Sequence, residues 1–171
     1  MLAQEQLRPL LEVKNLSQHF RLSRGHTVRA VNEVSFCIYP GEVYGLVGES
    51  GSGKSTVARA ITRLYRPTGG EIFFHDACIS GRLGREEKRL LGTKMQMIFQ
   101  DPMTCLNPVF TIGHQLSEVF RLHQGMNKKE AWEASINALR MVNVAMPEKR
   151  VKDYPYQMSG GMRQRVMIAM A

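Results

Sequence analysis

The residues Gly48 to Thr56, GESGSGKST, combine glycines, hydroxyl groups and a lysine in one short loop. Glycines let successive backbone N–H groups converge on phosphate oxygens, and Lys54 can reach the β- and γ-phosphates of a nucleotide. The hydroxyl of Ser55 can bind a magnesium ion. The loop therefore predicts a site for a magnesium-bound nucleotide phosphate, and its candidate contacts are Gly48, Glu49, Ser50, Gly51, Ser52, Gly53, Lys54, Ser55 and Thr56.

This loop pattern is informative when a strand leads into it and a helix follows it. The preceding run 42–48, EVYGLVG, is apolar almost throughout, which predicts a strand buried on both faces of a parallel sheet. Residues 55–64 then read as a helix, whose N-terminus adds partial positive charge at the loop. A glycine-rich turn that matches the pattern by chance is the alternative, and the flanking elements argue against it.

Two segments before the loop alternate apolar and polar residues, which predicts half-exposed antiparallel strands. They are 10–20 and 30–38, with a turn between them. After the loop the patterns predict, in order, a turn at 67–71, a short strand at 71–74, a helix at 85–92 that a terminal glycine ends, and a strand at 95–100.

From residue 101 the sequence changes in character. Two prolines predict an irregular connector over 101–109. Thr111 can cap a helix that Gly125 closes, and Asn127 followed by Glu130 resembles a capping box that opens a second helix. These patterns predict a small helical lobe inserted into an α/β core.

Composition narrows the class of protein further. The chain has 171 residues, of which 43% are hydrophobic, and this suits one compact domain. Its longest apolar run is 166–171 and its opening lacks a signal-peptide core, so a soluble, cytosolic chain is expected. The net charge of +8 comes from dispersed basic residues, which favours solvated faces over a nucleic-acid surface. The cysteines and histidines lack metal-ligand spacing, so no metal besides magnesium is expected.

Two further motifs lie downstream: Gln100 within IFQDPMTCLNP, and MSGGMRQR at 158–165. Together with the loop and the opening stretch LLEVKNL they resemble the nucleotide-binding subunits of ATP-binding-cassette (ABC) transporters, most closely those of dipeptide, oligopeptide and nickel importers. The resemblance runs the whole length of the chain. It implies an α/β fold with a P-loop NTPase (RecA-like) core, an N-terminal antiparallel β subdomain and an inserted helical subdomain, incomplete at the C-terminus.

The resemblance assigns roles to individual residues. Residues 48–56 correspond to the Walker A loop, in which Lys54 contributes to catalysis. Gln100 corresponds to the Q-loop glutamine, which in the family touches magnesium and the attacking water, so Gln100 and the Walker A serine are the implied metal ligands. Phe20 lies where the family usually places an aromatic residue that stacks on adenine. A core strand residue is the alternative interpretation of Phe20, and His19 or a later residue could align in its place.

The sequence SGGM at 159–162 corresponds to the signature of the family, with methionine where glutamine is commonest. A serine and two glycines before a helix offer a hydroxyl, backbone N–H groups and a helix dipole to an anion. Taken alone, such a sequence is more often an ordinary N-cap and turn. In the family the anion is the γ-phosphate of ATP held by another subunit, so the implied contacts are Ser159, Gly160 and Gly161.

The family places a Walker B aspartate, a neighbouring glutamate, a D-loop and a switch histidine after the signature helix, and none lies within these 171 residues. The apolar final helix has no stop signal, so a truncated domain with poor hydrolysis and marginal stability is expected. The expected parts are the antiparallel subdomain at 1–42, the P-loop core at 43–100, the helical subdomain at 101–160 and a helix returning to the core at 161–171.

The implied function is that of the ATP-binding (ATPase) subunit of an importer for peptides or related solutes, with ATP and Mg²⁺ as cofactors. Implied partners are a second ATPase subunit, identical or different, and transmembrane permease subunits that contact residues 101–110 at the cytoplasmic face of the inner membrane. No nucleic acid is expected. Two alternatives stay open: a non-transport ABC ATPase that acts on nucleic acid, and a truncated, inert nucleotide-binding remnant. The sequence does not distinguish peptide from nickel or glutathione as the solute.

Overall fold

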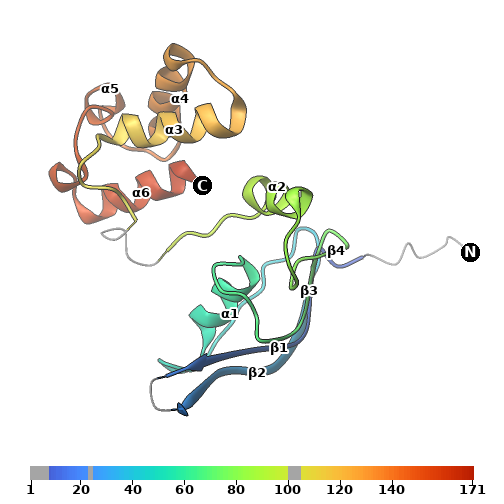
Figure 1. Cartoon of the computed structure of the whole chain (residues 1–171). Coiled ribbons are helices and arrows are strands. Elements are labelled where there is room, and N and C mark those ends of the chain that lie inside the picture. Colours follow the sequence, from blue (N-terminus) through green and yellow to red (C-terminus); the bar gives the residue numbers. More distant parts are fainter. Residues whose placement is uncertain (1–7, 23–24, 100–104) are drawn as a thin grey trace, which may run out of the picture. The chain divides into compact units, whose positions relative to one another are not determined.

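The structure is a computed structural model that describes residues 8–22, 25–99 and 105–171. The described residues form two compact units that divide between Met95 and Gln96. A β-sheet with two helices makes up the first unit, and a group of helices makes up the second (Figure 1). Each unit is described separately below.

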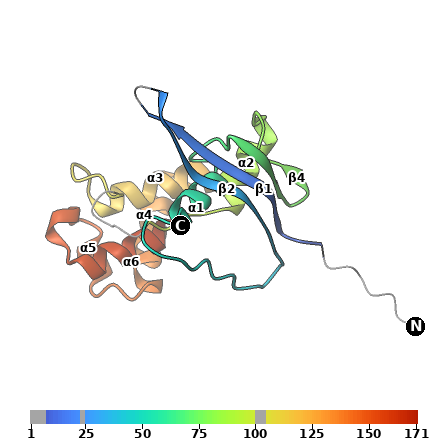
Figure 2. The same ribbon diagram turned by 90° about the horizontal axis from the view of Figure 1, so that it is seen from below.

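The first unit is built on a four-stranded sheet in the order β2-β1-β3-β4, antiparallel at each pairing. Its strands are β1 (Leu11–Arg21), β2 (Thr27–Ile38), β3 (Gly69–Phe74) and β4 (Ala77–Cys78). The long β1–β2 hairpin, which Figure 2 shows along its length, confirms the predicted antiparallel pair. The strand predicted at 71–74 is also present and begins already at Gly69.

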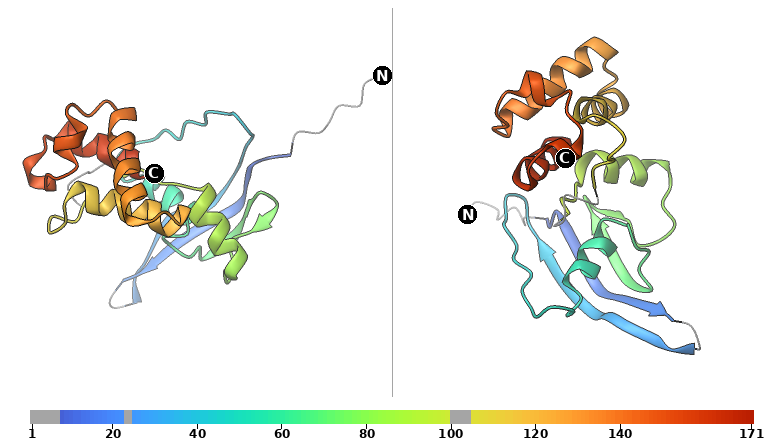
Figure 3. Two further views of the ribbon diagram at one scale, coloured as in Figure 1. Left: turned by 90° about the horizontal axis from the view of Figure 1, so that it is seen from above. Right: turned by 90° about the vertical axis from the view of Figure 1, so that its left-hand side faces the viewer.

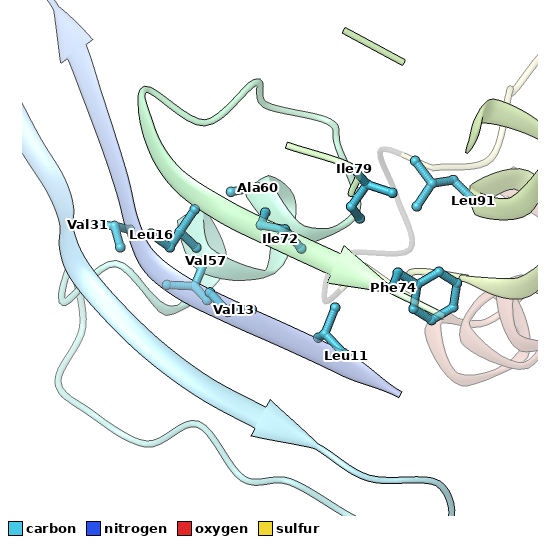
Figure 4. Packing of buried hydrophobic residues seen from close by; sticks show 10 residues of the cluster. All are labelled: Leu11, Val13, Leu16, Val31, Val57, Ala60, Ile72, Phe74, Ile79 and Leu91. Atoms are coloured by element: carbon cyan, nitrogen blue, oxygen red, sulfur yellow. The ribbon is translucent and has the colours of Figure 1, made fainter. Parts of the chain in front are cut away.

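The core of the first unit lies on one face of this sheet. Val13 and Leu16 of β1 and Ile72 of β3 are at most 1% exposed. Val57 and Ala60 from helix α1 (Lys54–Ile61) join the same cluster, as Figure 4 shows, and α1 lies over the sheet (Figure 3, right). Packing of these two residues therefore holds α1, and the loop that precedes it, against the sheet.

Two predicted strands are wrong for the described residues. Neither 42–48 nor 95–99 forms a strand, and the side chains of Val43 and Val47 are 98% and 90% exposed. A strand of a parallel sheet forms through hydrogen bonds to neighbouring strands, and the sheet of the described residues is built from β1 to β4, which pair antiparallel with one another. Residues 42–48 instead leave β2 as an extended arm (Figure 2), and the ring of Tyr44 stacks on Phe36 at a centroid distance of 5.0 Å.

The helix predicted at 85–92 is present but longer than expected. Helix α2 (Arg85–Lys94) continues past Gly92, and the Met95 N–H donates to the Leu91 carbonyl at 3.1 Å. Leu91 is buried against the core of the first unit, so packing carries the helix through a residue that favours a stop.

The second unit contains α3 (Ile112–Gln124), α4 (Lys128–Met141), α5 (Pro147–Arg150) and α6 (Gly160–Met170). The predicted caps are confirmed. The Thr111 hydroxyl accepts a hydrogen bond from the His114 N–H at 3.3 Å, and Gly125 ends α3 with a φ of 67°. Asn127 and Glu130 form the reciprocal capping box at the start of α4.

The core of the second unit joins α3, α4 and α6. Ile112, Leu116, Leu139 and Val166 are fully buried and belong to one cluster. Arg165 of α6 donates to the Asn143 carbonyl at 2.6 Å, just after the end of α4, so the two helices are also linked by a hydrogen bond. Among the described residues, no helix combines the length and apolar character that a membrane crossing requires.

Candidate functional site

The predicted phosphate loop is anchored at its C-terminal end. Gly48, Gly51 and Gly53 have φ values of 156°, 83° and 94°, a region that residues with a Cβ rarely adopt. Gly53 is the N-cap of α1, and a Cβ at this position would collide with the carbonyl oxygen of Ala30 in β2. The loop thus turns tightly against the sheet before α1 begins.

The side chain of Lys54 folds back into this loop. Its Nζ donates to the carbonyl oxygens of Gly48 at 2.7 Å and Glu49 at 2.6 Å, and lies 3.4 Å from the Ser52 hydroxyl. All three acceptors are neutral oxygens, so these contacts leave the positive charge of the ammonium in the loop. Such a charge beside glycine backbone suits an anion.

The N-terminus of α1 adds to this positive potential. Its first turn carries no acidic residue, and its N-cap, Gly53, has no side chain that could accept from the free N–H groups. Residues 48–52 and Ser55 are exposed. A polyphosphate could therefore reach the loop from solvent, and the exposed Ser55 hydroxyl could ligate a magnesium ion that the phosphates carry. The residues present fit a polyphosphate such as that of ATP, together with Mg²⁺.

Phe20, the candidate adenine contact, lies near the end of β1. Its ring meets the ring of Tyr65 edge to face, with centroids 5.3 Å apart, and its backbone faces Val28 of β2. The side chain is half-buried. These contacts hold the ring in place on the sheet, and stacking on adenine stays a prediction.

The candidate signature residues begin α6 in the second unit. Ser159 is the N-cap, and its Oγ accepts from the Met162 N–H at 3.3 Å. Gly160 and Gly161 are exposed, and a Cβ at either would meet no atom within 4 Å. Packing within the unit therefore does not explain these glycines, whereas close approach of an anion to their backbone would.

The replacement Gly161→Ala is expected to raise the free energy of unfolding by up to about 1 kcal/mol, because glycine is a poorer helix residue than alanine and the new methyl group has room. Urea denaturation followed by circular dichroism measures this change. A destabilised variant would show that a contact within the chain, rather than a ligand, requires glycine here.

The structure leaves the candidate residues in separate groups. Residues 48–56 and Phe20 belong to the first unit, and 159–161 to the second. Gln100 lies outside the described residues. Sequence reasoning missed one polar residue of interest, the buried Gln115, although the helical spacing of 112, 115, 116 and 119 already placed it on the apolar face of α3.

Comparisons with known proteins also point to the ABC transporter family. Residues 31–171 match the family described as ABC transporter. The chain is 47% identical to the oligopeptide transport ATP-binding protein OppD of Escherichia coli K12, covering 99% of this chain and 51% of OppD. It is 44% identical to the dipeptide transport ATP-binding protein DppD of Bacillus subtilis, covering 95% of this chain and 50% of DppD. The chain thus spans about half the length of these curated relatives.

Solved structures share the fold. The dimeric ATP-binding cassette MJ0796, in a post-hydrolysis state bound to ADP and Pi, is 27% identical with a TM-score of 0.81, covering 94% of this chain and 68% of the other. CbiO1 of Clostridium perfringens, part of the ABC transporter complex cbiONQ, is 25% identical with a TM-score of 0.70, covering 95% of this chain and 60% of the other.

Proposed function

The chain belongs to the ABC transporter family, and from this membership we propose that it binds MgATP at residues 48–56 as part of the ATP-binding subunit of a peptide importer. The family resemblance and the ABC ATPase fold predicted from the sequence are confirmed by the comparisons. The relatives named for oligopeptide and dipeptide transport support the choice of peptides as the solute.

The placement of Lys54 is the observation that carries this proposal. Its ammonium is held by the Gly48 and Glu49 carbonyls, in front of the uncapped N-terminus of α1. On binding, Lys54 exchanges these neutral acceptors for phosphate oxygens, which form stronger, charge-assisted hydrogen bonds. Backbone N–H groups of the loop orient the phosphates, and Ser55 supplies a hydroxyl for magnesium. The ion, when bound, neutralises phosphate charge.

The second part of the proposal concerns a partner subunit. Ser159, Gly160 and Gly161 lie at an exposed helix N-terminus, and we propose that they face the nucleotide held by a second ATPase subunit. The dimeric state of the related cassette MJ0796 supports this arrangement. Transmembrane permeases at the cytoplasmic face of the membrane would then contact the connector after Gln100, where Val109 is 73% exposed and Phe110 is 44% exposed.

Isothermal titration of the 171-residue chain with nucleotides tests the proposal. We expect saturable binding of MgATP that is weakened by EDTA and much stronger than binding of AMP, because the loop and Lys54 contact the β- and γ-phosphates. Equal affinity for ATP and AMP would contradict a polyphosphate site, and so would the absence of binding by a chain that circular dichroism shows to be folded.

A further inference from the structure

Gln115 is a buried polar residue that uses each polar atom of its side chain. The residue is 7% exposed. Its Oε1 accepts a hydrogen bond from the Asn107 N–H at 2.9 Å, and its Nε2 donates to the carbonyl oxygens of Asn107 and Phe110 at 3.0 Å each. The side chain of Gln115 therefore binds the main chain of residues 107–110 both as an acceptor, from an N–H group, and as a donor, to two carbonyl oxygens.

The segment that Gln115 holds is a compact turn with an apolar tip. The Asn107 Oδ1 accepts from the Val109 N–H at 3.0 Å, and the Phe110 ring stacks on His114 of α3 with centroids 4.6 Å apart. Leu106, just before the turn, is 4% exposed and belongs to the core of the second unit. The turn is thus fixed to α3, while the side chains of Val109 and Phe110 stay exposed at its tip.

The described segments on both sides of Gln100 share a cavity with the C-terminal end of α6. Residues 96–99, together with Cys105 and Leu106, line a cavity of about 170 Å³ with Met167, Met170 and Ala171. Helix α6 begins at the other end with the candidate signature residues, after Ser159. Residues 96–99, Cys105 and Leu106 therefore lie beside the C-terminal end of the helix that the signature residues begin.

We propose that Gln115 is a positioning residue that fixes the turn at 107–110 to α3, so that this turn and α6 respond to a nucleotide together. This role rests on the proposed function, because the second unit can respond to a nucleotide only if MgATP binds. A leucine at position 115 would fill a similar volume but would remove the side-chain partner of the Asn107 N–H and of the Phe110 carbonyl oxygen. The Asn107 carbonyl oxygen would keep only its hydrogen bond from the Phe110 N–H. The turn would then be attached to α3 less tightly.

Amide hydrogen exchange of the whole 171-residue chain tests the contact itself. In the wild type, the Asn107 amide is expected to exchange at least about tenfold more slowly than in an unstructured peptide, and Gln115→Leu is expected to remove about tenfold of protection. The matched control is Glu118→Gln, on an exposed position of the same helix, and it should leave the rate unchanged. An unprotected Asn107 amide in the wild type would overturn the proposal even if the leucine variant did not fold.

A second measurement separates positioning from simple support. In the wild type, MgATP is expected to slow exchange at 105–111 and at 159–163 together. In Gln115→Leu the affinity for MgATP should stay within about twofold, because the phosphate loop is in the other unit, while the response at 159–163 is lost. If MgATP still slows exchange at 159–163 in this variant, the positioning role of Gln115 is refuted, but the proposed function is not. A folded wild type without MgATP affinity refutes the proposed function and, with it, the coupling.

Discussion

The affinity for MgATP is expected to fall about 100-fold when Lys54 is replaced by alanine. The proposal places the ammonium against the β- and γ-phosphates, and charge-assisted hydrogen bonds of this kind contribute about 1.5–3 kcal/mol each. In the structure the hydrogen bonds of the same side chain go to neutral oxygens of its own loop. Its removal should therefore affect binding far more than folding. Isothermal titration of both proteins measures the change.

Lys88→Ala is the matched control for this experiment. Lys88 lies on an exposed position of α2, in the same unit, and its replacement removes the same charge from the chain. Its effect on affinity should stay within about twofold, because long-range attraction between exposed charges is screened by salt. Equal losses in both variants would mean that overall charge, rather than a specific phosphate contact, attracts the nucleotide.

The second unit is expected to lose about 3 kcal/mol of stability in Gly113→Ala. Gly113 is buried in the first turn of α3, and a Cβ there would lie 2.5 Å from Val151 Cγ2 and 2.6 Å from Trp132 Cζ3. Its N–H also donates to the Val151 carbonyl oxygen at 2.7 Å. An added methyl group must therefore push the backbone of residue 151 away from α3 and lengthen this hydrogen bond. Urea denaturation followed by the fluorescence of Trp132, the single tryptophan, reports the loss.

Gly161→Ala provides the comparison within the same unit. Both replacements add one methyl group to a helical glycine, but the group meets packed atoms at position 113 and open space at position 161. The two changes in unfolding free energy should therefore have opposite signs. A Gly113→Ala variant as stable as the wild type would show that α3 can shift away from Val151 at no cost.

The sequence predicted best those features that depend on near neighbours. The caps at Thr111 and Asn127 use residues within one helical turn, and the alternation of 10–20 and 30–38 is visible without knowledge of the fold. The strands expected at 42–48 and 95–100 failed because a parallel strand needs partners from distant parts of a sequence, and composition alone does not show whether they pair.

In the candidate site, too, the features that depend on neighbouring residues were predictable, and those that depend on distant residues were not. The phosphate loop could be read from its own residues, including the turn glycines and the lysine. The contacts that hold the site could not, because each joins segments that are far apart or irregular. The carbonyl oxygen of Ala30, which is distant in the sequence, leaves no room for a side chain at Gly53. Gln115 binds Asn107, in an irregular segment whose conformation cannot be predicted from a periodic pattern.

The phosphate loop is packed against the sheet at its C-terminal end and exposed at its N-terminal end, and this difference affects the thermodynamics of ligand binding. Gly53 packs closely against Ala30 of β2. The arm at 42–48 is exposed, and its Tyr44 ring stacks on Phe36 of the sheet. A ligand that binds the loop must also restrict the motion of this arm. Its binding is therefore expected to have a favourable enthalpy and an unfavourable entropy, because the arm loses conformational freedom. The affinity of the loop for such a ligand is therefore expected to fall as the temperature rises.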